Sequence, residues 1–260
     1  MLIHKYVTGN RIDILERGLI RFTQSSALND PFETEPNLCD LEAYLRRLGL
    51  RTIEEQRDRG TFMQLAVAEF MLEPTIRKKL AKFRQDNSSN FAFLSLTRKE
   101  NNLLMWSHYS DSHRGFLLGF ESDDPFFQTT IYREVRALTE VTYLPTRPIM
   151  PAPDQNWTNL AEILFFTKSD HWSYEEELRL VKNPQFADDV IPVGDGQDIY
   201  LFKFPAKSLK QIILGYRMLP ELRQRICQVI KAEYPDVQLL EAHISSAHFE
   251  LDIRPYGPKR

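Results

Sequence analysis

The chain of 260 residues is poor in cysteine, with only Cys39 and Cys227, which lie far apart and match no metal-binding spacing. Long apolar runs are also missing, since none reaches the roughly 18 residues that a membrane-spanning helix needs. The first residues lack the apolar core of a secretion signal. We therefore expect a cytoplasmic protein with reduced cysteines and no membrane partner.

An excess of basic residues is absent as well. The 33 Lys and Arg residues stand against 36 Asp and Glu residues, which gives a net charge of −3. This balance argues against a broadly basic surface for duplex nucleic acid, although local basic patches stay open. No GxGxxG motif occurs, which excludes a Rossmann-type NAD site in its usual form. Hydrophobic residues make up 42% of the chain, enough to build a core.

The pattern of apolar residues predicts strands on both sides of a helical block. Between residue 38 and about residue 90, apolar residues recur three and four positions apart, as in helices. Short alternating or continuous apolar runs predict strands at 2–7, 19–24, 91–97, 115–121, 174–182 and through the last quarter of the chain. We therefore predict the α+β class, with a single mixed, mostly antiparallel sheet and flanking helices. Residues 1–260 are expected to form one domain with a helical insertion at about 38–90.

Three segments concentrate chemically active side chains, and the first is NDPFE at residues 29–33. Asp30 can close a turn onto its own backbone, Pro31 fixes φ, and Phe32 is expected to plug the core beneath. In a functional interpretation, Asp30 and Glu33 lie on the lip of a cleft. In a structural one, the segment is only a turn.

The second segment, LLMWSHYSDSHRG at residues 103–115, has six bulky, polar-tipped residues within nine positions. On a helix, Met105 and Tyr109 share a face. His108 has an ordinary pKa near neutrality, which suits a general acid or base. It can equally be a core histidine with a satisfied hydrogen bond. His108 and His113 lack the HExxH spacing, so we predict no metal site.

The third segment is HWSYEEELRLV at residues 171–181. If it forms a strand, Glu175, Glu177 and Arg179 share one face. The two carboxylates would lie about 7 Å apart, twice the rise per residue, and could act on one substrate. Arg179 could hold one of them ionised. The alternative is an edge strand with a solvated charged face.

These segments carry a resemblance to a large, mostly bacterial family that is catalogued only as a domain of unknown function. The resemblance spans nearly the whole chain except the helical insertion, and it implies no activity. The shared motifs are KY (5–6), NDPFE (29–33), LSLT (94–97), LLMWSHYSDSHRG (103–115), VTYL (141–144), K…W.YE.E.R (168–179) and ILG (213–215).

The chain also resembles, more distantly, ADP-ribosyltransferases, including bacterial toxins that modify DNA. Those enzymes have an aromatic residue or histidine on an early strand, a small hydroxyl residue on a middle strand and a late glutamate, sometimes as Glu-x-Glu. The corresponding residues here are His4 or Tyr6, Ser95 or Thr97, and Glu175-x-Glu177, and the sequence leaves open which of His4, Lys5 and Tyr6 faces the pocket. The resemblance implies an NAD-using enzyme in defence or toxin biology. Its substrate would be the nucleotide NAD, its acceptor an unidentified protein or nucleic acid, and no metal is predicted.

In this hypothesis the catalytic residues are Glu177, Glu175 and His108. Breaking the bond between nicotinamide and ribose develops positive charge on the sugar, which a fixed carboxylate such as Glu177 stabilises. Glu175 would orient the acceptor or take its proton, and Arg114 or Arg11 would pair with the pyrophosphate. The full set expected to bind NAD is His4, Tyr6, Asp30, Ser95, Tyr109, Arg114 and Arg179.

Two other functions stay open. In a non-catalytic binding module, MWSHY and NDPFE form a structural clasp, and the glutamates pair with Arg179 to fix a sheet. In a metal-dependent nuclease or hydrolase, Asp30, Glu33, His108 and Glu175 supply the ligands.

Overall fold

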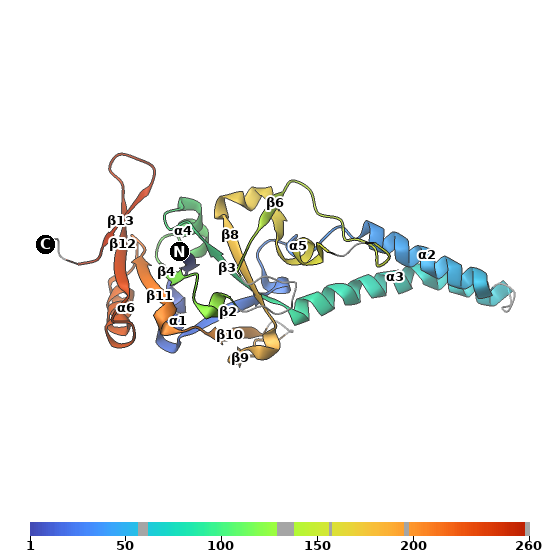
Figure 1. The fold of residues 1–260 in the computed structure, drawn as a ribbon, viewed down its shortest axis with the longest axis horizontal. Coiled ribbons are helices and arrows are strands. Elements are labelled where there is room, and N and C mark those ends of the chain that lie inside the picture. Colours follow the sequence, from blue (N-terminus) through green and yellow to red (C-terminus); the bar gives the residue numbers. More distant parts are fainter. Residues whose placement is uncertain (57–61, 129–137, 156–157, 195–197, 258–260) are drawn as a thin grey trace.

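The computed structural model describes residues 1–56, 62–128, 138–155, 158–194 and 198–257 (Figure 1). The α-helices are α1 (Asp13–Arg17), α2 (Cys39–Gln56), α3 (Phe62–Asn90), α4 (Leu103–Tyr109), α5 (Leu160–Phe165) and α6 (Pro220–Glu233). The strands are β1 (Leu2–Val7), β2 (Leu19–Gln24), β3 (Ala92–Thr97), β4 (Phe116–Glu121), β5 (Thr139–Glu140), β6 (Thr142–Leu144), β7 (Thr167–Ser169), β8 (Glu177–Lys182), β9 (Asp189–Ile191), β10 (Ile199–Lys203), β11 (Leu209–Leu214), β12 (Gln238–Ile244) and β13 (Leu251–Pro255). Short 3-10 helices are η1 (Gly9–Arg11), η2 (Ser25–Ala27), η3 (Pro125–Phe127), η4 (Asp170–Glu175), η5 (Pro184–Phe186) and η6 (Ala206–Ser208).

Within the described residues, eleven strands form one sheet in the order β13-β12-β11-β4-β1-β3-β2-β10-β9, with β8 added to β3 and β5 to β8. Pairing in this sheet is antiparallel except for the parallel pair β11–β12, among the strands described. Strands β6 and β7 form a small parallel sheet beside it. The predicted α+β class and the mixed, mostly antiparallel sheet are therefore confirmed.

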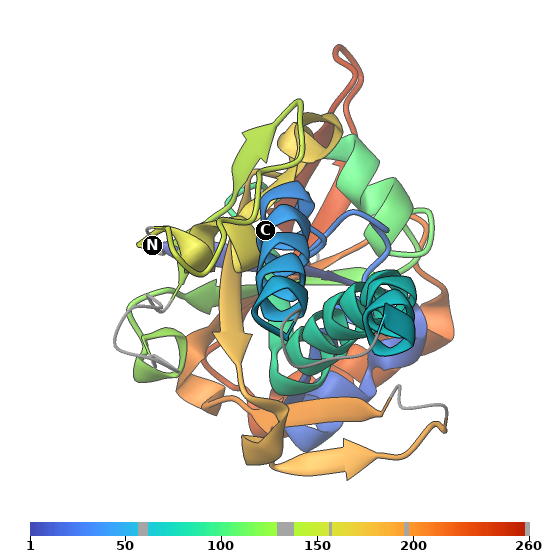
Figure 2. The ribbon, with the colours of Figure 1, turned by 90° about the vertical axis from the view of Figure 1, so that its right-hand side faces the viewer.

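The helical insertion is a hairpin of α2 and α3 that extends away from the sheet (Figures 1 and 2). At its base, Leu41, Ile76 and Leu80 are buried in a cluster with Phe93 of β3 and Phe165 of α5. The helical insertion predicted as part of the fold is thus present, formed by α2 and α3. None of the described helices is both long enough and apolar enough to cross a membrane.

Strand β3 has a divided edge. Along one side it pairs with β8 over its full length, Ala92 to Thr97. On the other side β2 pairs only at residues 92–93 and β1 only at Thr97. Two strands cannot occupy the same edge, so β1 and β2 diverge, and residues 94–96 have no ladder partner there. The ammonium of Lys5 fills part of this gap and donates to the carbonyl oxygen of Ser95 at 3.0 Å.

The two faces of the sheet differ in what covers them. Helices α1 and α6 contribute Ile14, Leu15 and Ile226 to the largest apolar cluster, which also holds Leu94 and Leu96 of β3. The intervening side chains of β3 point to the opposite face. On that face one apolar cluster lies at the base of the hairpin and another lies around α4, where Tyr6 contacts Trp106.

Candidate functional site

The late acidic segment is not one continuous strand, so the prediction for 174–182 is wrong in its first part. Glu175 ends η4, Glu176 adopts a left-handed backbone with φ of 43°, and β8 begins at Glu177. Two long-range hydrogen bonds hold this turn: Asn102 Nδ2 donates to Tyr174 O, and Thr97 Oγ1 donates to Glu175 O. Glu175 and Glu177 therefore do not share a pleated face. Both are nevertheless buried, and both reach the same cation.

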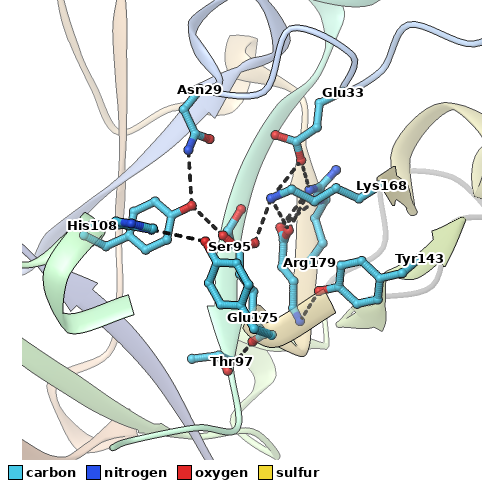
Figure 3. A network of polar contacts seen from close by, with 12 residues as sticks. Asn29, Glu33, Ser95, Thr97, His108, Tyr143, Lys168, Glu175 and Arg179 are labelled. Carbon is cyan, nitrogen blue, oxygen red and sulfur yellow. Dashed lines mark hydrogen bonds and ion pairs between the residues drawn. The ribbon is translucent and has the colours of Figure 1, made fainter. Parts of the chain in front are cut away.

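That cation is Lys168 on β7, which lies among three carboxylates (Figure 3). Its Nζ atom is 2.7 Å from Glu175 Oε2, 3.2 Å from Glu177 Oε2 and 3.6 Å from Glu33 Oε1. The same atom lies 5.0 Å from the centre of the Trp172 ring, a cation–π contact. We call Glu33, Lys168, Glu175, Glu177 and Arg179 the acidic cluster.

Arg179 joins the other side of the acidic cluster. Its Nε and Nη2 atoms donate to Glu177 Oε1 and Oε2 at 2.8 and 2.9 Å, a bidentate arrangement. Nη2 also contacts Glu33, and Nη1 donates to Phe165 O at 2.9 Å. The side chain is completely buried and lies over the ring of Phe93. Arg179 thus links the NDPFE loop to β8.

Burial and neighbouring charges shift the pKa values of Glu177 and Glu33 in opposite directions. Burial disfavours ionisation of Glu177, but the charges of Arg179 and Lys168 outweigh it and lower the pKa of Glu177 to about 2. For Glu33, burial dominates over the same two cations, and the pKa is raised. Three carboxylates share two cations here, so one of them accepts a proton more readily. Such a separation of carboxyl pKa values is typical of acid–base sites.

Hydroxyl groups complete the surroundings of the acidic cluster. Tyr109 on α4 donates its hydroxyl to Glu175 Oε1 at 2.5 Å and accepts from Asn29 Nδ2 at 3.2 Å. The Ser95 side chain hydrogen-bonds Glu177, which helps to lower the pKa of that carboxyl. The backbone N–H of Glu177 donates to the Tyr143 hydroxyl at 2.8 Å. Most of these polar groups lie within the network that Figure 3 shows.

A cavity of about 250 Å³ opens beside the acidic cluster, between the diverging strands β1 and β2. It is lined by carboxylates, lysines, hydroxyls and a few apolar side chains. The lining residues are His4, Lys5, Tyr6, Thr23, Ala27, Leu28, Asn29, Glu33, Phe93, Ser95, Leu96, Met105, Tyr109, Lys168, Glu175 and Glu177. A hollow with convergent polar groups and perturbed pKa values is the usual form of a binding or active site.

Comparison with known proteins finds one family model that matches a segment containing part of this site. Residues 105–180 match the family model described as "Protein of unknown function (DUF2971)". The predicted resemblance to a domain-of-unknown-function family is confirmed for this segment. The DUF2971 segment holds Lys168, Glu175, Glu177 and Arg179, whereas Glu33 lies outside it. No curated protein and no solved structure matches the chain.

Of the residues predicted for catalysis, two lie at the cavity and one does not. Glu175 and Glu177 form part of its wall. His108, within the DUF2971 segment, is exposed, lies outside the cavity lining, and pairs through Nδ1 with the Tyr174 hydroxyl at 3.1 Å. The helical periodicity of α4 places Tyr109 and Met105 inward, and His108 falls on its outer side.

Four of the residues predicted to bind NAD line the cavity: His4, Tyr6, Ser95 and Tyr109. Both the ring and the hydroxyl of Tyr6 are engaged within the protein: the ring packs edge-on against Trp106, and the hydroxyl donates to Lys99 O. His4 contacts Gln211 and Glu100. Among His4, Lys5 and Tyr6 of β1, Lys5 is the residue whose ammonium enters the gap beside the carboxylates of Glu175 and Glu177.

The remaining three predicted ligands lie elsewhere. Arg179 supports the wall from behind and is not among the lining residues. Arg114 is half-exposed and pairs with Asp111. Asp30 is buried and closes the predicted turn, accepting from Phe32 N at 2.9 Å. The expectation that Phe32 plugs the core is wrong, because 58% of its surface is exposed and Arg147 lies over its ring.

Sequence reasoning assigned no role to Lys168 and gave Lys5 and Glu33 too small a part. Lys168 belongs to the motif K…W.YE.E.R, but spacing alone does not show that its ammonium enters a carboxylate cluster. The nuclease or hydrolase hypothesis gains no support, because Lys168 and Arg179 occupy the space between the carboxylates. Among the described residues, no three His, Cys, Asp or Glu side chains are arranged to hold a metal ion.

Proposed function

We propose that the chain is an NAD-using, ADP-ribosyltransferase-like enzyme whose reaction takes place in the cavity beside the acidic cluster. The observation that carries this proposal is the position of Glu175 and Glu177, two buried carboxylates in the wall of a hollow. Glu177 stays ionised over the physiological pH range because Arg179 and Lys168 hold its pKa at about 2. A fixed negative charge in a site shielded from water is what an oxocarbenium-like transition state requires.

In the proposed reaction, one glutamate stabilises the developing positive charge and another accepts a proton. The C1′–N bond breaks, and its electron pair leaves with nicotinamide. Positive charge then develops on the ribose next to Glu177. The lone pair of the acceptor forms the new bond to C1′, and Glu175 or Glu33 takes the acceptor proton. Burial raises the pKa of Glu33, whereas the pKa of Glu177 is lowered, so Glu33 is a stronger base than Glu177.

The size of the cavity limits what enters it. At about 250 Å³, it is smaller than the roughly 300–1,000 Å³ of most small-molecule sites. The proposal therefore puts nicotinamide and its ribose inside, and the remainder of NAD along the gap between β1 and β2. Tyr109 offers an aromatic face at the wall, and Asn29 offers an amide.

Release of nicotinamide from NAD tests the proposal directly. We expect the intact chain to release nicotinamide in the presence of a mixture of protein and nucleic-acid acceptors. Glu175→Gln and Glu177→Gln should reduce the rate by about a hundredfold or more, the usual loss when an electrostatic catalyst is removed. Glu176→Gln is the matched control, because Glu176 lies between them but is half-exposed and pairs with Lys99.

The non-catalytic binding module has its own supporting observation, the complete enclosure of Arg179 by Glu33, Glu177 and a backbone carbonyl. In this alternative, the sole role of the network is to fasten the NDPFE loop to the sheet. In that case NAD is not consumed, and both glutamine variants lose stability without any change in a catalytic rate. Absence of nicotinamide release from the wild-type chain would favour this alternative.

A further inference from the structure

Arg21 on β2 forms no ion pair with a carboxylate of the described residues. Its Nε atom is buried and has no hydrogen-bond partner within the described part of the chain. Burial lowers the pKa of Arg21, and the nearby charge of Arg11 lowers it further. The guanidinium is only partly buried, but a buried Nε–H group without a hydrogen bond is unfavourable. Such an arrangement is expected where an anion arrives from outside.

The registers of β1 and β2 against β3 place Arg21 and Lys5 within one residue of the same level of β3. Thr23 pairs with Phe93, so two residues back along β2, Arg21 is level with Ser95. His4 pairs with Thr97, so Lys5 is level with Leu96. Since β1 and β2 diverge at this level, the two cations flank the gap between the strands. Thr23, on the same face of β2 as Arg21, lines the cavity together with Lys5.

The charge of a third cation, Arg11, acts on both Lys5 and Arg21. Its charge, like that of Arg21, acts on Lys5, whose pKa burial lowers to about 8 despite the opposing charges of Glu177 and Glu175. Arg11 has one carboxylate partner, Asp13, at 3.0 Å. Three cations therefore gather around one end of the gap, and the acidic cluster lies beside it.

We infer that Lys5, Arg11 and Arg21 form a subsite for the pyrophosphate group of the nucleotide substrate, in the gap between β1 and β2. The inference rests on the proposed function, because it supplies the anchor for the part of NAD that the cavity is too small to hold. Guanidinium groups suit this role, since their planar N–H donors match phosphate oxygens. Lys5 would lie between the phosphates and the ribose, within reach of both the gap and the acidic cluster.

Binding of inorganic pyrophosphate, followed by titration calorimetry on the full chain, tests the subsite. We expect Arg21→Gln to weaken binding by about tenfold or more, the usual contribution of one charge-assisted hydrogen bond. Arg21→Lys, which keeps the positive charge but not the planar set of N–H donors, should weaken pyrophosphate binding less. Arg17→Gln is the matched control: Arg17 lies on α1 in the same part of the chain but pairs with Asp189 on the surface.

The outcomes separate the subsite from the proposed enzyme. If pyrophosphate binds and Arg21→Gln weakens it while NAD is never consumed, the subsite stands and the transferase proposal fails. If NAD is consumed and Arg21→Gln leaves the KM for NAD unchanged, the subsite is wrong and the enzyme proposal stands. Equal loss of pyrophosphate binding in Arg17→Gln and Arg21→Gln would show only non-specific charge attraction and would overturn the subsite.

Discussion

The ammonium of Lys168 lies 2.7 Å from Oε2 of Glu175, and both side chains are buried. Burial alone would lower the pKa of Lys168, but the charges of Glu177, Glu33 and Glu175 outweigh it and raise that pKa. The lysine therefore stays charged and holds carboxylates from two segments, the NDPFE loop and the η4–β8 turn, around one centre. The position of the proposed catalytic glutamates depends on this contact.

Removal of the lysine charge should destabilise the fold strongly. Lys168→Met leaves three buried carboxylates with only Arg179 between them, and breaking a buried ion pair from one side usually costs about 3–5 kcal/mol. Urea unfolding measures the loss. Adding Glu33→Gln should recover part of it, because burial raises the pKa of Glu33 and the amide removes one carboxylate charge from the cluster. Lys82→Met, which breaks the exposed pair with Asp86, should leave the free energy of unfolding nearly unchanged.

Acid should remove the stabilisation that Glu177 supplies. The pKa of Glu177 falls from an ordinary 4.5 to about 2 in the folded chain, so its contribution is complete above pH 4.5 and is lost as the pH falls toward 2. The difference in unfolding free energy between wild type and Glu177→Gln should shrink over this interval. Urea unfolding at several pH values from 5 to 2.5 checks it. A constant difference across the range would contradict the assigned ionisation.

Raising the pH above neutrality should increase the free energy of unfolding through Lys5. Its pKa falls from an ordinary 10.5 to about 8 on folding, so between these values the unfolded chain binds more protons than the folded one. Stability contributed through Lys5 therefore rises with pH in this window. Lys5→Met should abolish that rise, whereas Lys210→Met, at an exposed position of β11, should keep it. Unfolding measured between pH 7.5 and 10.5 distinguishes the two variants.

The hydroxyl of Tyr109 should matter for turnover more than for stability. Tyr109→Phe removes one hydrogen bond to Glu175 Oε1, a loss of about 0.5–1.5 kcal/mol in unfolding free energy. Among the described residues, Lys168 is then the remaining partner of the carboxylate, so nicotinamide release should fall by about tenfold. Tyr234→Phe, which removes a comparable bond to Leu15 O on the far face, should lower stability without changing kcat. Equal kcat values for the two variants would argue against a role for Tyr109 in positioning Glu175.

Several features of the fold could be predicted because their causes are local. Helical periodicity predicted α2 and α3, and alternation or short apolar runs predicted β1 to β4. Asn102 caps α4 by accepting from the N–H groups of Leu104 and Met105, a signal present in the sequence itself. The turn at Asp30 was foreseen for the same reason.

The prediction failed where distant contacts overrode a local pattern. The alternation around Glu175 is typical of a strand, but Thr97 and Asn102 bind the backbone there and turn it into η4. His108 has suitable chemistry, yet the packing of Met105 and Trp106 turns α4 so that His108 lies outside the cavity. Neither outcome can be computed from spacing along the chain.

By itself, the sequence determined the order of helices and strands, the insertion and the residue types from which a polar site could be built. Only the tertiary structure decided that Glu33 and Arg179, 146 positions apart, touch each other. The reason is physical, because periodicity and capping act over only a few residues. The pairing of β8 with one edge of β3, and the competition of β1 and β2 for the other edge of β3, instead join segments that are far apart in the chain. That competition opens the gap beside which the carboxylates are buried.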